Sequence, residues 1–365
     1  MKTTKKNKII IATGGTGGHV FPAYGLAKNF IKNDYLVEII TDIRGLKYLD
    51  KNKNIKFILN NSATIFKKNI IDLFLSVFAI FFSYIRSLVI LFRAKPTLVF
   101  GMGGYASFPV CIAAKTLNIP FIIYENNIQI GKSNKYLLPF ALKIFVSYPD
   151  LVGINNEYKY KMIFTGNIIR EEILNFKRNN QFKPDVLNIL VLGGSQAAKS
   201  FGEILPKVFE KCIKENIRIK IFQQCIESQN NKLKVKYENL KISCELFNFT
   251  NNISEYFSKV ELAITRSGSS ITAELINCKI PFISIPYSHS AESHQDKNAA
   301  YFEKKGYSFS IKESEVDQKL YPLIKSIYKD KEILNNLIKK QKNHSDSNVF
   351  FKINNEVKNL INEQN

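Results

Sequence analysis

The residues best suited to chemistry lie near the start of the chain, in the stretch TGGTGGHVFP over residues 13–22. It follows the apolar run of residues 9–12 and brings His19 to the expected start of a helix. A glycine turn between a strand and a helix presents backbone N–H groups at the positive end of the helix dipole, where a phosphate can bind. The same glycines would let a substrate approach His19. A phosphate site, a position for a catalytic histidine and a plain tight turn are therefore the three interpretations.

A dinucleotide-binding site is one form of the phosphate interpretation. Gly15 and Gly17 fit the first two glycines of the fingerprint, but Val20 stands where a third Gly or Ala is needed. Asp42 ends the second expected strand, well beyond the usual spacing of about 20 residues for the carboxylate that binds ribose. Both departures argue against a nicotinamide cofactor.

Two further motifs of the first half lie where expected strands end. GMGGYASFP, residues 101–109, is a second glycine turn between a strand and a helix, and YENN, residues 124–127, ends the next strand. Each motif alone could be structural. Because the carboxyl ends of parallel strands line one edge of a sheet, the three motifs together predict a ligand site along that edge.

The second half of the chain repeats this pattern. GGSQAAKS, residues 193–200, has the same arrangement for binding an anion, and TRSGSSITAE, residues 265–274, is a hydroxyl-rich turn that enters a helix. Glu274 could accept hydrogen bonds from vicinal sugar hydroxyls, or merely favour the helix dipole. HQDKNA, residues 294–299, adds amide and imidazole donors before another helix. The sequence contains neither the P-loop pattern GxxxxGK[ST] nor the hydrolase pattern GxSxG.

Apolar runs supply the strands that must position these motifs. In the first half they span residues 9–12, 36–41, 97–101, 120–124, 144–147 and 162–165, with helical stretches between them. Continuous apolar runs of this length are typical of strands buried on both faces of a parallel sheet. After the polar stretch of residues 175–185 the pattern restarts with LNILVLGGSQ and continues through RIKIFQQC, ELAITRSGSS and PFISIPY. We therefore expect an α/β protein with two Rossmann-like domains and a linker at about residues 175–185.

The composition limits the number of domains and the kinds of partner and site, but it does not assign a function. A length of 365 residues favours two domains over one. The formal net charge of +21 attracts polyanions of any kind, whether nucleic acid, an anionic membrane or phosphorylated substrates. Five scattered cysteines and four histidines form no CxxC or HxxxH pair, which argues against a disulfide framework and a metal centre.

One apolar segment, IIDLFLSVFAIFFSYIRSLVILF over residues 70–92, does not fit a soluble fold easily. Asp72 and Arg86 interrupt it, and a membrane span here would separate two strands expected in one sheet. A buried crossover helix is the alternative, but aromatic and aliphatic residues occupy every face. Basic residues flank the segment, namely Lys67, Lys68, Arg93 and Lys95. We expect a helix that docks on an anionic membrane surface, using about residues 65–95.

Taken in order, seven motifs closely resemble the MurG family of glycosyltransferases, which add N-acetylglucosamine to the lipid-linked muramoyl-pentapeptide of peptidoglycan synthesis. They are GGTGGHVFPA, GMGGYASFP, YENN, GNIIR, GGSQAA, RSGSSITAE and HQDKNA. The resemblance covers about residues 8–300 and continues less distinctly through the C-terminal helices. It implies a GT-B fold, in which two Rossmann-like domains face each other across a cleft, and inverting chemistry without a metal or cofactor.

The resemblance also implies how the chain is divided. An N-terminal domain over residues 8–165 would bind the acceptor and dock on the membrane, and a helix at about residues 345–365 would pack back on it. A C-terminal domain over residues 166–344 would bind the UDP-sugar. The family's pattern departs at two positions, where Ala197 replaces a usual glycine and Ile168 a usual proline, and neither change removes a functional side chain.

Individual site residues follow from the matched motifs. Ser195 resembles the residue on the donor's diphosphate, and Thr250 lies where the family contacts uracil through its backbone. Glu274 resembles the residue on the ribose hydroxyls and Gln295 the residue on the hexose hydroxyls. The donor-binding loop continues through Ser269, Ser270, Ile271, Thr272 and Ala273, and further positions lining the cleft are Thr16, Gly17, Gly18, Asn127 and Arg170.

The implied mechanism needs a general base, because the 4-hydroxyl of muramic acid must lose a proton as it attacks the anomeric carbon. His19 is the proposed base, and Glu125 is the second candidate. Helix N-termini after residues 193–196, together with Arg170, would stabilise the leaving diphosphate.

The implied partners are UDP-N-acetylglucosamine, the polyprenyl-diphosphate-linked acceptor and the cytoplasmic face of a bacterial inner membrane, with no nucleic acid. The nearest alternative is another GT-B lipid glycosyltransferase, such as a diacylglycerol galactosyltransferase. A nicotinamide-dependent reductase and a non-catalytic protein that binds the membrane surface are alternatives from other classes.

Overall fold

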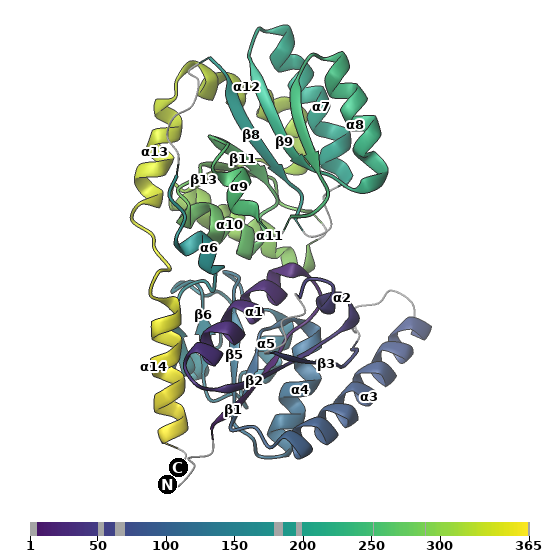
Figure 1. Ribbon diagram of the computed structural model, residues 1–365, viewed down its shortest axis with the longest axis vertical. Helices are drawn as coiled ribbons and strands as arrows, with labels where there is room; N and C mark the ends of the chain where they lie inside the picture. The colour runs from purple at the N-terminus through teal and green to yellow at the C-terminus, as the bar shows by residue number, and fades with distance from the viewer. Residues whose placement is uncertain are drawn as a thin grey trace. The chain divides into compact units, whose positions relative to one another are not determined.

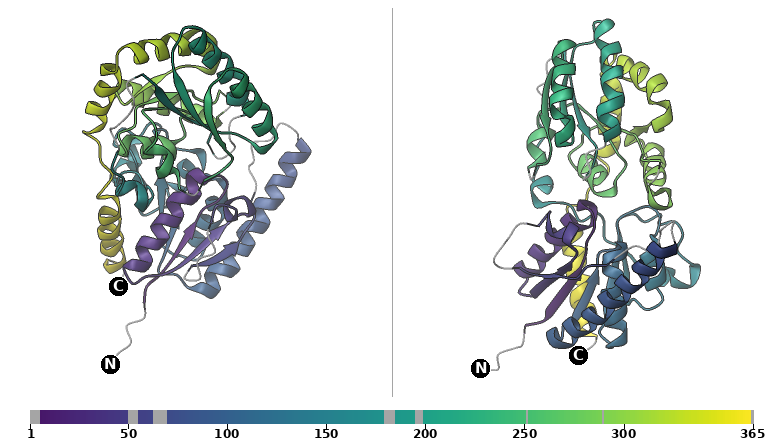
Figure 2. Two further views of the ribbon diagram at one scale, coloured as in Figure 1. Left: turned by 45° about the horizontal axis from the view of Figure 1, so that its top comes forward. Right: turned by 90° about the vertical axis from the view of Figure 1, so that its right-hand side faces the viewer.

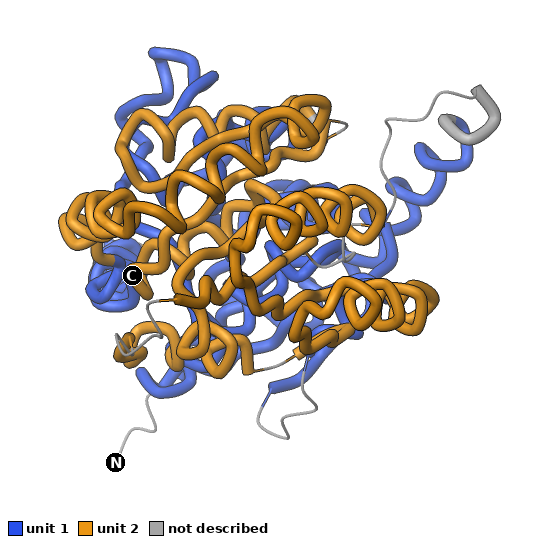
Figure 3. Tube along the Cα trace, turned by 90° about the horizontal axis from the view of Figure 1, so that it is seen from above, with its two compact units in different colours: residues 1–170, 346–365 blue, residues 171–345 orange. Residues whose placement is uncertain are grey.

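The computed structural model of the chain describes residues 6–49, 55–62, 70–178, 185–194, 199–250, 252–288 and 290–363 (Figure 1). The chain divides into two compact units (Figure 3). Unit 1 contains Met1–Arg170 and Asp346–Asn365, drawn in blue, and unit 2 contains Glu171–Ser345, drawn in orange. Each unit is built on a parallel sheet with helices, so the expected α/β architecture with two Rossmann-like domains is confirmed.

The described part of unit 1 holds a seven-stranded parallel sheet in the order β3-β2-β1-β4-β5-β6-β7. Its strands are β1 (Lys8–Ala12), β2 (Leu36–Thr41), β3 (Lys56–Leu59), β4 (Leu98–Gly101), β5 (Phe121–Glu125), β6 (Ile144–Val146) and β7 (Met162–Phe164). Ile9 and Ile11 face one hydrophobic core while Ile10 faces another, because successive side chains of a strand point to opposite faces. Burial on both faces is why β1 is a continuous apolar run.

Helices cover both faces of this sheet. α1 (Gly17–Lys32) and α14 (Val349–Asn362) pack on the face of Ile9. α3 (Ile70–Ala94), α4 (Gly104–Thr116) and α5 (Lys132–Leu137) pack on the face of Ile10. The short helices α2 (Ile43–Leu46) and η1 (Asn156–Lys161) lie in connections. α14 comes from the far end of the chain and lies beside α1, where Asn29 Nδ2 donates a hydrogen bond to Asn354 Oδ1 at 2.7 Å (Figure 2).

The described part of unit 2 holds a six-stranded parallel sheet in the order β10-β9-β8-β11-β12-β13. Its strands are β8 (Leu187–Leu192), β9 (Ile219–Gln224), β10 (Ser243–Phe247), β11 (Leu262–Thr265), β12 (Phe282–Ser284) and β13 (Ser308–Ser310). Its helices are α6 (Glu171–Leu174), α7 (Lys199–Lys214), α8 (Glu227–Asn239), α9 (Ile253–Phe257), α10 (Ser269–Asn277), η2 (Ala291–Ser293), α11 (His294–Lys304), η3 (Glu313–Glu315), α12 (Val316–Lys329) and α13 (Glu332–Gln341). The largest core joins β8 and β9 to α7 and α12.

Residues 166–170 were expected to open the C-terminal domain, but they belong to unit 1. Two buried side chains of unit 1 hold this segment. The Tyr124 hydroxyl accepts a hydrogen bond from Ile168 N at 2.9 Å, and Asp346 Oδ1 accepts one from Asn167 N at 2.9 Å. Of the expected linker, residues 179–184 lie outside the described residues.

The expected strands of the first half match β1, β2, β4, β5, β6 and β7 to within one residue at each end. The sequence does not predict β3, β10 or β13. All three are edge strands with half-exposed residues, so they lack the continuous apolar run that marks a central strand.

The burial pattern of α3 is inverted. From Phe74 onward its buried side chains are Ser76, Ser83, Ser87 and Leu91. Its exposed large apolar side chains are Phe74, Leu75, Val77, Phe78, Phe81, Phe82, Ile85, Val89 and Phe92. Asn60 Nδ2 donates to Ser83 O at 3.1 Å and to Ser87 Oγ at 2.8 Å, so polar contacts add to the apolar contact of Leu88 and Leu91 with the core of the unit. The segment Phe74–Ala94 is long and apolar enough to cross a membrane, with mean hydropathy 2.1 and 22% of its most apolar stretch buried.

Candidate active site

Three loops of unit 1 meet at the carboxyl ends of the adjacent strands β1, β4 and β5. The loop after β1 leads into α1, whose first turn carries His19. His19 Nδ1 lies 3.0 Å from the carbonyl oxygen of Met102, in the loop after β4. Asn126, in the loop after β5, donates a hydrogen bond through Nδ2 to Gly18 O at 3.1 Å. The prediction that these three motifs share one edge of a sheet is therefore confirmed.

The hydrogen bond to Met102 determines which nitrogen of His19 carries the proton. A carbonyl oxygen only accepts hydrogen bonds, so Nδ1–H donates to it and Nε2 holds the lone pair of the neutral ring. A Cβ atom built on Gly104 would lie 3.5 Å from Nε2. Gly103 and Gly104 have φ of 81° and 74°, which favours glycine, so no side chain crowds the ring from this turn. His19 can therefore accept a proton at Nε2.

Asp42, buried just after β2, anchors the first glycine turn. Its Oδ1 accepts hydrogen bonds from Gly15 N at 2.9 Å and Gly45 N at 2.8 Å, and its Oδ2 accepts one from the Tyr105 hydroxyl at 2.7 Å. A Gly15 N–H that already donates to a carboxylate is not available to a phosphate. The geometry argues against both the phosphate and the dinucleotide interpretation of this turn.

Glu125 is buried, and hydrogen bonds occupy both of its carboxylate oxygens. Oε1 accepts from Asn127 N at 3.0 Å and from Asn127 Nδ2 at 3.1 Å. Oε2 accepts from Gly131 N at 2.9 Å and from Asn134 Nδ2 at 2.9 Å. A general base must offer a lone pair to the substrate, and here four donors already use those lone pairs. This arrangement favours Glu125 as the anchor of the loop that carries Asn127, rather than as the base.

The remaining predicted positions of unit 1 lie at the same end of its sheet. Thr16 is exposed at the N-cap of α1, and Gly17 and Gly18 form the first turn of that helix. Arg170 is half-buried, and its guanidinium lies 5.4 Å from the ring centroid of Phe21 on α1.

Unit 2 has the corresponding arrangement at the adjacent strands β8, β11 and β12. The loop after β8 leads into α7, but Ser195 lies outside the described residues. The loop after β11 leads into α10, whose first turns hold Ser269, Ser270, Ile271, Thr272, Ala273 and Glu274. Glu274 is buried, and the hydroxyl of Thr272 donates to Gly268 O at 2.9 Å. The predicted donor-binding loop is therefore the N-terminus of a helix, where the dipole favours an anion.

Two more donor-site predictions can be located in unit 2. Gln295 lies in the first turn of α11, and its Oε1 accepts a hydrogen bond from Tyr287 N at 2.9 Å. The bond fixes the carboxamide, because the oxygen faces the chain after β12. Thr250 follows β10, and its hydroxyl oxygen accepts from Asn252 N at 3.0 Å. The roles of these residues toward a substrate stay predictions.

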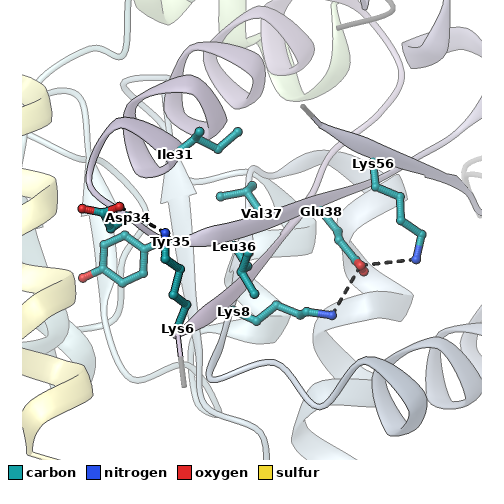
Figure 4. Close-up of a pocket in the computed structure, with 9 residues that line it drawn as sticks. All are labelled: Lys6, Lys8, Ile31, Asp34, Tyr35, Leu36, Val37, Glu38 and Lys56. Atoms are coloured by element: carbon teal, nitrogen blue, oxygen red, sulfur yellow. Dashed lines mark hydrogen bonds and ion pairs between the residues drawn. The ribbon is translucent and has the colours of Figure 1, made fainter. Parts of the chain in front are cut away.

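The pocket in Figure 4 lies at the other end of the unit 1 sheet. It has a volume of about 420 Å³ and is bounded by Lys8, Leu36 and Lys56, the first residues of β1, β2 and β3. Glu38 Oε1 pairs with Lys8 at 3.4 Å and with Lys56 at 3.3 Å. Since the glycine turns follow the carboxyl ends of the strands, this pocket is not part of the candidate site. Among the described residues, no three His, Cys, Asp or Glu side chains gather as a metal site would need.

Comparisons with known proteins match both units. Residues 9–146 match the glycosyltransferase family 28 N-terminal domain, and residues 188–353 match the family 28 C-terminal domain. A protein of Pelagibacter ubique, 33% identical over 98% of this chain and 99% of its own length, is named UDP-N-acetylglucosamine--N-acetylmuramyl-(pentapeptide) pyrophosphoryl-undecaprenol N-acetylglucosamine transferase. A Rickettsia felis protein of the same name is 33% identical over 92% of this chain and 96% of its own length. The chain belongs to this transferase family.

Solved structures agree in fold. The crystal structure of Acinetobacter baumannii MurG superposes with a TM-score of 0.76 at 24% identity, covering 98% of this chain and 99% of that one. The Staphylococcus aureus MnaA–UDP structure superposes with a TM-score of 0.71 at 16% identity, covering 98% and 97%. The MurG resemblance, the GT-B fold class and the prediction of a glycosyltransferase are confirmed.

Sequence reasoning misses the residues that hold the loops in place. It considers Asp42 only as a ribose-binding carboxylate and Arg266 only as part of a hydroxyl-rich turn, and it does not single out Asn134. A charged residue next to a glycine or serine turn, at the end of an apolar strand, is the signal that could have found Asp42 and Arg266. The carbonyl of Met102 is a backbone atom and leaves no signal in the sequence.

Proposed function

We propose that the chain transfers N-acetylglucosamine from UDP-N-acetylglucosamine to the 4-hydroxyl of the muramoyl-pentapeptide of a polyprenyl-diphosphate-linked intermediate, with inversion at the anomeric carbon. Family membership and the names of the relatives support this substrate pair. The observation that carries the mechanism is the hydrogen bond between His19 Nδ1 and Met102 O, which leaves Nε2 as the proton acceptor.

In the proposed reaction His19 Nε2 takes the proton of the acceptor hydroxyl. The oxygen forms its bond to the anomeric carbon while the bond from that carbon to the UDP oxygen breaks, and the electron pair leaves with the diphosphate. General-base catalysis of this kind contributes about 10²- to 10⁴-fold to a rate. Glu125 and Asn126 would keep the loop after β5 in place beside the histidine.

Donor binding is assigned to unit 2. The N-termini of α7 and α10 offer backbone N–H groups and the positive ends of helix dipoles to the diphosphate. Glu274 would accept hydrogen bonds from the ribose hydroxyls and Gln295 would bind the hexose. Ser195 and Arg170 are proposed to contribute to the diphosphate and Thr250 to the uracil.

A transfer assay tests this proposal. Radiolabelled UDP-N-acetylglucosamine and a short-chain analogue of the lipid acceptor should give labelled product with the wild-type protein, and His19→Ala should reduce turnover. Transfer from UDP-galactose but not from UDP-N-acetylglucosamine would instead identify another lipid glycosyltransferase. Stabilisation by NAD(H) with none by UDP-sugars would identify a reductase, and wild-type protein without any transfer would identify a binding protein.

We also propose that α3 docks unit 1 on the cytoplasmic face of a bacterial inner membrane as a peripheral contact. Its exposed face is apolar and its buried face carries serines, the reverse of a helix that faces water. Arg86, Arg93 and Lys95 are exposed near this face and suit anionic lipids. A docked helix fits better than a span, because α3 packs along α4 and belongs to a crossover within one sheet.

Vesicle sedimentation tests the docking surface. A triple change of Phe78, Phe81 and Phe82 to serine should release the protein from vesicles of phosphatidylglycerol and phosphatidylethanolamine. Phe351→Ser is the matched control, because Phe351 is 67% exposed on α14 of the same unit. Equal loss of binding in the control, or no loss in the triple variant, would contradict the assignment.

A further inference from the structure

Arg266 follows β11 and is buried, although arginine is seldom found inside a protein without partners. Its Nη1 group donates to the carbonyls of Ile285 and Pro286, both at 3.2 Å. Its Nη2 group donates to Ser200 Oγ at 2.7 Å and to Glu313 Oε1 at 2.6 Å. One guanidinium therefore joins the start of α7, the chain after β12 and η3, which follows β13.

Two aromatic rings pack against the same guanidinium. Its central carbon lies 4.5 Å from the ring centroid of Phe201 on α7 and 5.3 Å from that of Tyr287 after β12. Arginine suits this position because its planar group forms several hydrogen bonds in one plane and stacks on aromatic rings. Lysine offers a point charge and cannot reproduce both kinds of contact.

The partners of Arg266 belong to segments with different proposed tasks. Ser200 and Phe201 lie in the first turn of α7, which follows the turn at residues 193–196 that is proposed to bind the diphosphate. Pro286 and Tyr287 precede α11, and the backbone N–H of Tyr287 holds the Oε1 atom of Gln295. Arg266 thus links the segment for the diphosphate to the segment that orients the hexose-binding amide.

We propose that Arg266 is a positioning residue that sets where the hexose of the donor is held relative to its diphosphate. The inference rests on the proposed donor site and adds a residue that acts on the sugar through Gln295. The long helix α7 is anchored by other buried side chains, including Leu205 and Phe209, so it should keep its place without Arg266. The short chain after β12 loses two carbonyl contacts and a stacking partner, so the orientation of Gln295 should be lost first.

This difference gives a readout that a general loss of stability would not give. In Arg266→Gln, the Kd for UDP-N-acetylglucosamine should rise about tenfold, as expected for losing hydrogen bonds to a charged group. The Kd for UDP alone should rise by less than about threefold, since UDP lacks the sugar. Arg266→Lys should fall between the wild type and Arg266→Gln. Isothermal titration of both ligands into the full chain measures these ratios.

A double-mutant cycle tests the route through Gln295. In a Gln295→Ala background, Arg266→Gln should no longer weaken UDP-N-acetylglucosamine more than UDP. Arg218→Gln is the matched control, because Arg218 pairs with Asp185 at 2.8 Å on the surface at the amino end of β9, and both Kd values should stay unchanged.

Equal weakening of both ligands in Arg266→Gln, no weakening, or a full effect in the Gln295→Ala background would overturn the inference. If Arg266→Gln does not fold, Glu313→Gln is tested in its place. The ratio of its Kd for UDP-N-acetylglucosamine to its Kd for UDP should rise about threefold. Wild-type protein that binds UDP but not UDP-N-acetylglucosamine would contradict the proposed function itself, which keeps the two failures distinct.

Discussion

In unit 1 the loops at the carboxyl ends of the strands are held by carboxylates, and in unit 2 by a guanidinium. Asp42 and Glu125 accept hydrogen bonds from backbone and side-chain N–H groups, including Gly15 N and Gly131 N. Arg266 instead donates hydrogen bonds to the carbonyl oxygens of Ile285 and Pro286. A carboxylate uses up the N–H groups of a glycine turn, whereas a guanidinium uses carbonyls and leaves helix N-termini available to an anion.

The different anchoring side chains explain how the similar turns after β1 and β8 can serve different tasks. The turn after β1 has its Gly15 N–H bonded to Asp42 and presents His19, so it suits proton transfer. The turn after β8 precedes α7, and the nearby Arg266 bonds to the Ser200 hydroxyl and to Glu313 rather than to backbone N–H groups. Glycine content alone would make both turns phosphate sites, and the backbone groups that each anchoring side chain occupies separate them.

The largest expected effect is that of His19→Ala. Loss of the proton acceptor should lower kcat by about 10²- to 10⁴-fold in the transfer assay, because the acceptor hydroxyl would have to lose its proton to water. His344→Gln is the control, since His344 lies in unit 2 against Tyr307, and it should keep kcat within about twofold. Unchanged turnover in His19→Ala at saturating substrates would rule out His19 as the general base.

Glu274→Ala should act on binding rather than on turnover. Losing hydrogen bonds between a carboxylate and two hydroxyls should raise the KM for the donor about 10- to 100-fold, with a smaller change in kcat. Steady-state kinetics over a range of donor concentrations gives both constants. A large fall in kcat at unchanged KM would assign the catalytic step to unit 2 instead of unit 1.

Glu125→Gln distinguishes an anchor from a base. The amide puts an NH₂ group against donors that now meet a carboxylate, so the free energy of unfolding should fall by about 1–3 kcal/mol. Urea denaturation measures this change, and the pH dependence of kcat should keep its shape. If stability is unchanged while kcat loses its dependence on pH, Glu125 and not His19 accepts the proton.

The smallest effect is expected at the pocket of Figure 4. Glu38→Gln removes the ion pairs of the half-buried Glu38 with Lys8 and Lys56, and ion pairs near the surface contribute about 0–1 kcal/mol to stability. The variant should keep kcat and both KM values within about twofold of the wild type. A tenfold loss of transfer would show that the amino ends of these strands take part in function.

The sequence could predict the central strands and the glycine turns, because both have local patterns. Residues 9–12 form a continuous apolar run, which is typical of a buried strand, and the turns contain clustered glycines. The anchoring side chains have no such local pattern, because each joins positions that are distant in the sequence. Asp42 bonds to Gly15 only because β2 lies next to β1, and Arg266 meets Glu313 only once β11, β12 and β13 are paired.

The candidate site divides in the same way. The seven motifs were sufficient to predict the family and the residues expected on its substrates, which are properties of side-chain type and order. The protonated nitrogen of His19 depends on a backbone carbonyl, and the four hydrogen bonds of Glu125 depend on how residues 126–131 and the start of α5 pack around it. These details separate a base from an anchor, and they arise only in the folded chain.

The division of tasks between the two units is tested most directly by a calorimetric titration of UDP-N-acetylglucosamine into His19→Ala. If the first glycine turn serves proton transfer and unit 2 binds the donor, the Kd should match that of the wild type to within about twofold. A Kd raised about tenfold or more in a variant that remains folded would place the donor on the first glycine turn and contradict donor binding by unit 2 alone.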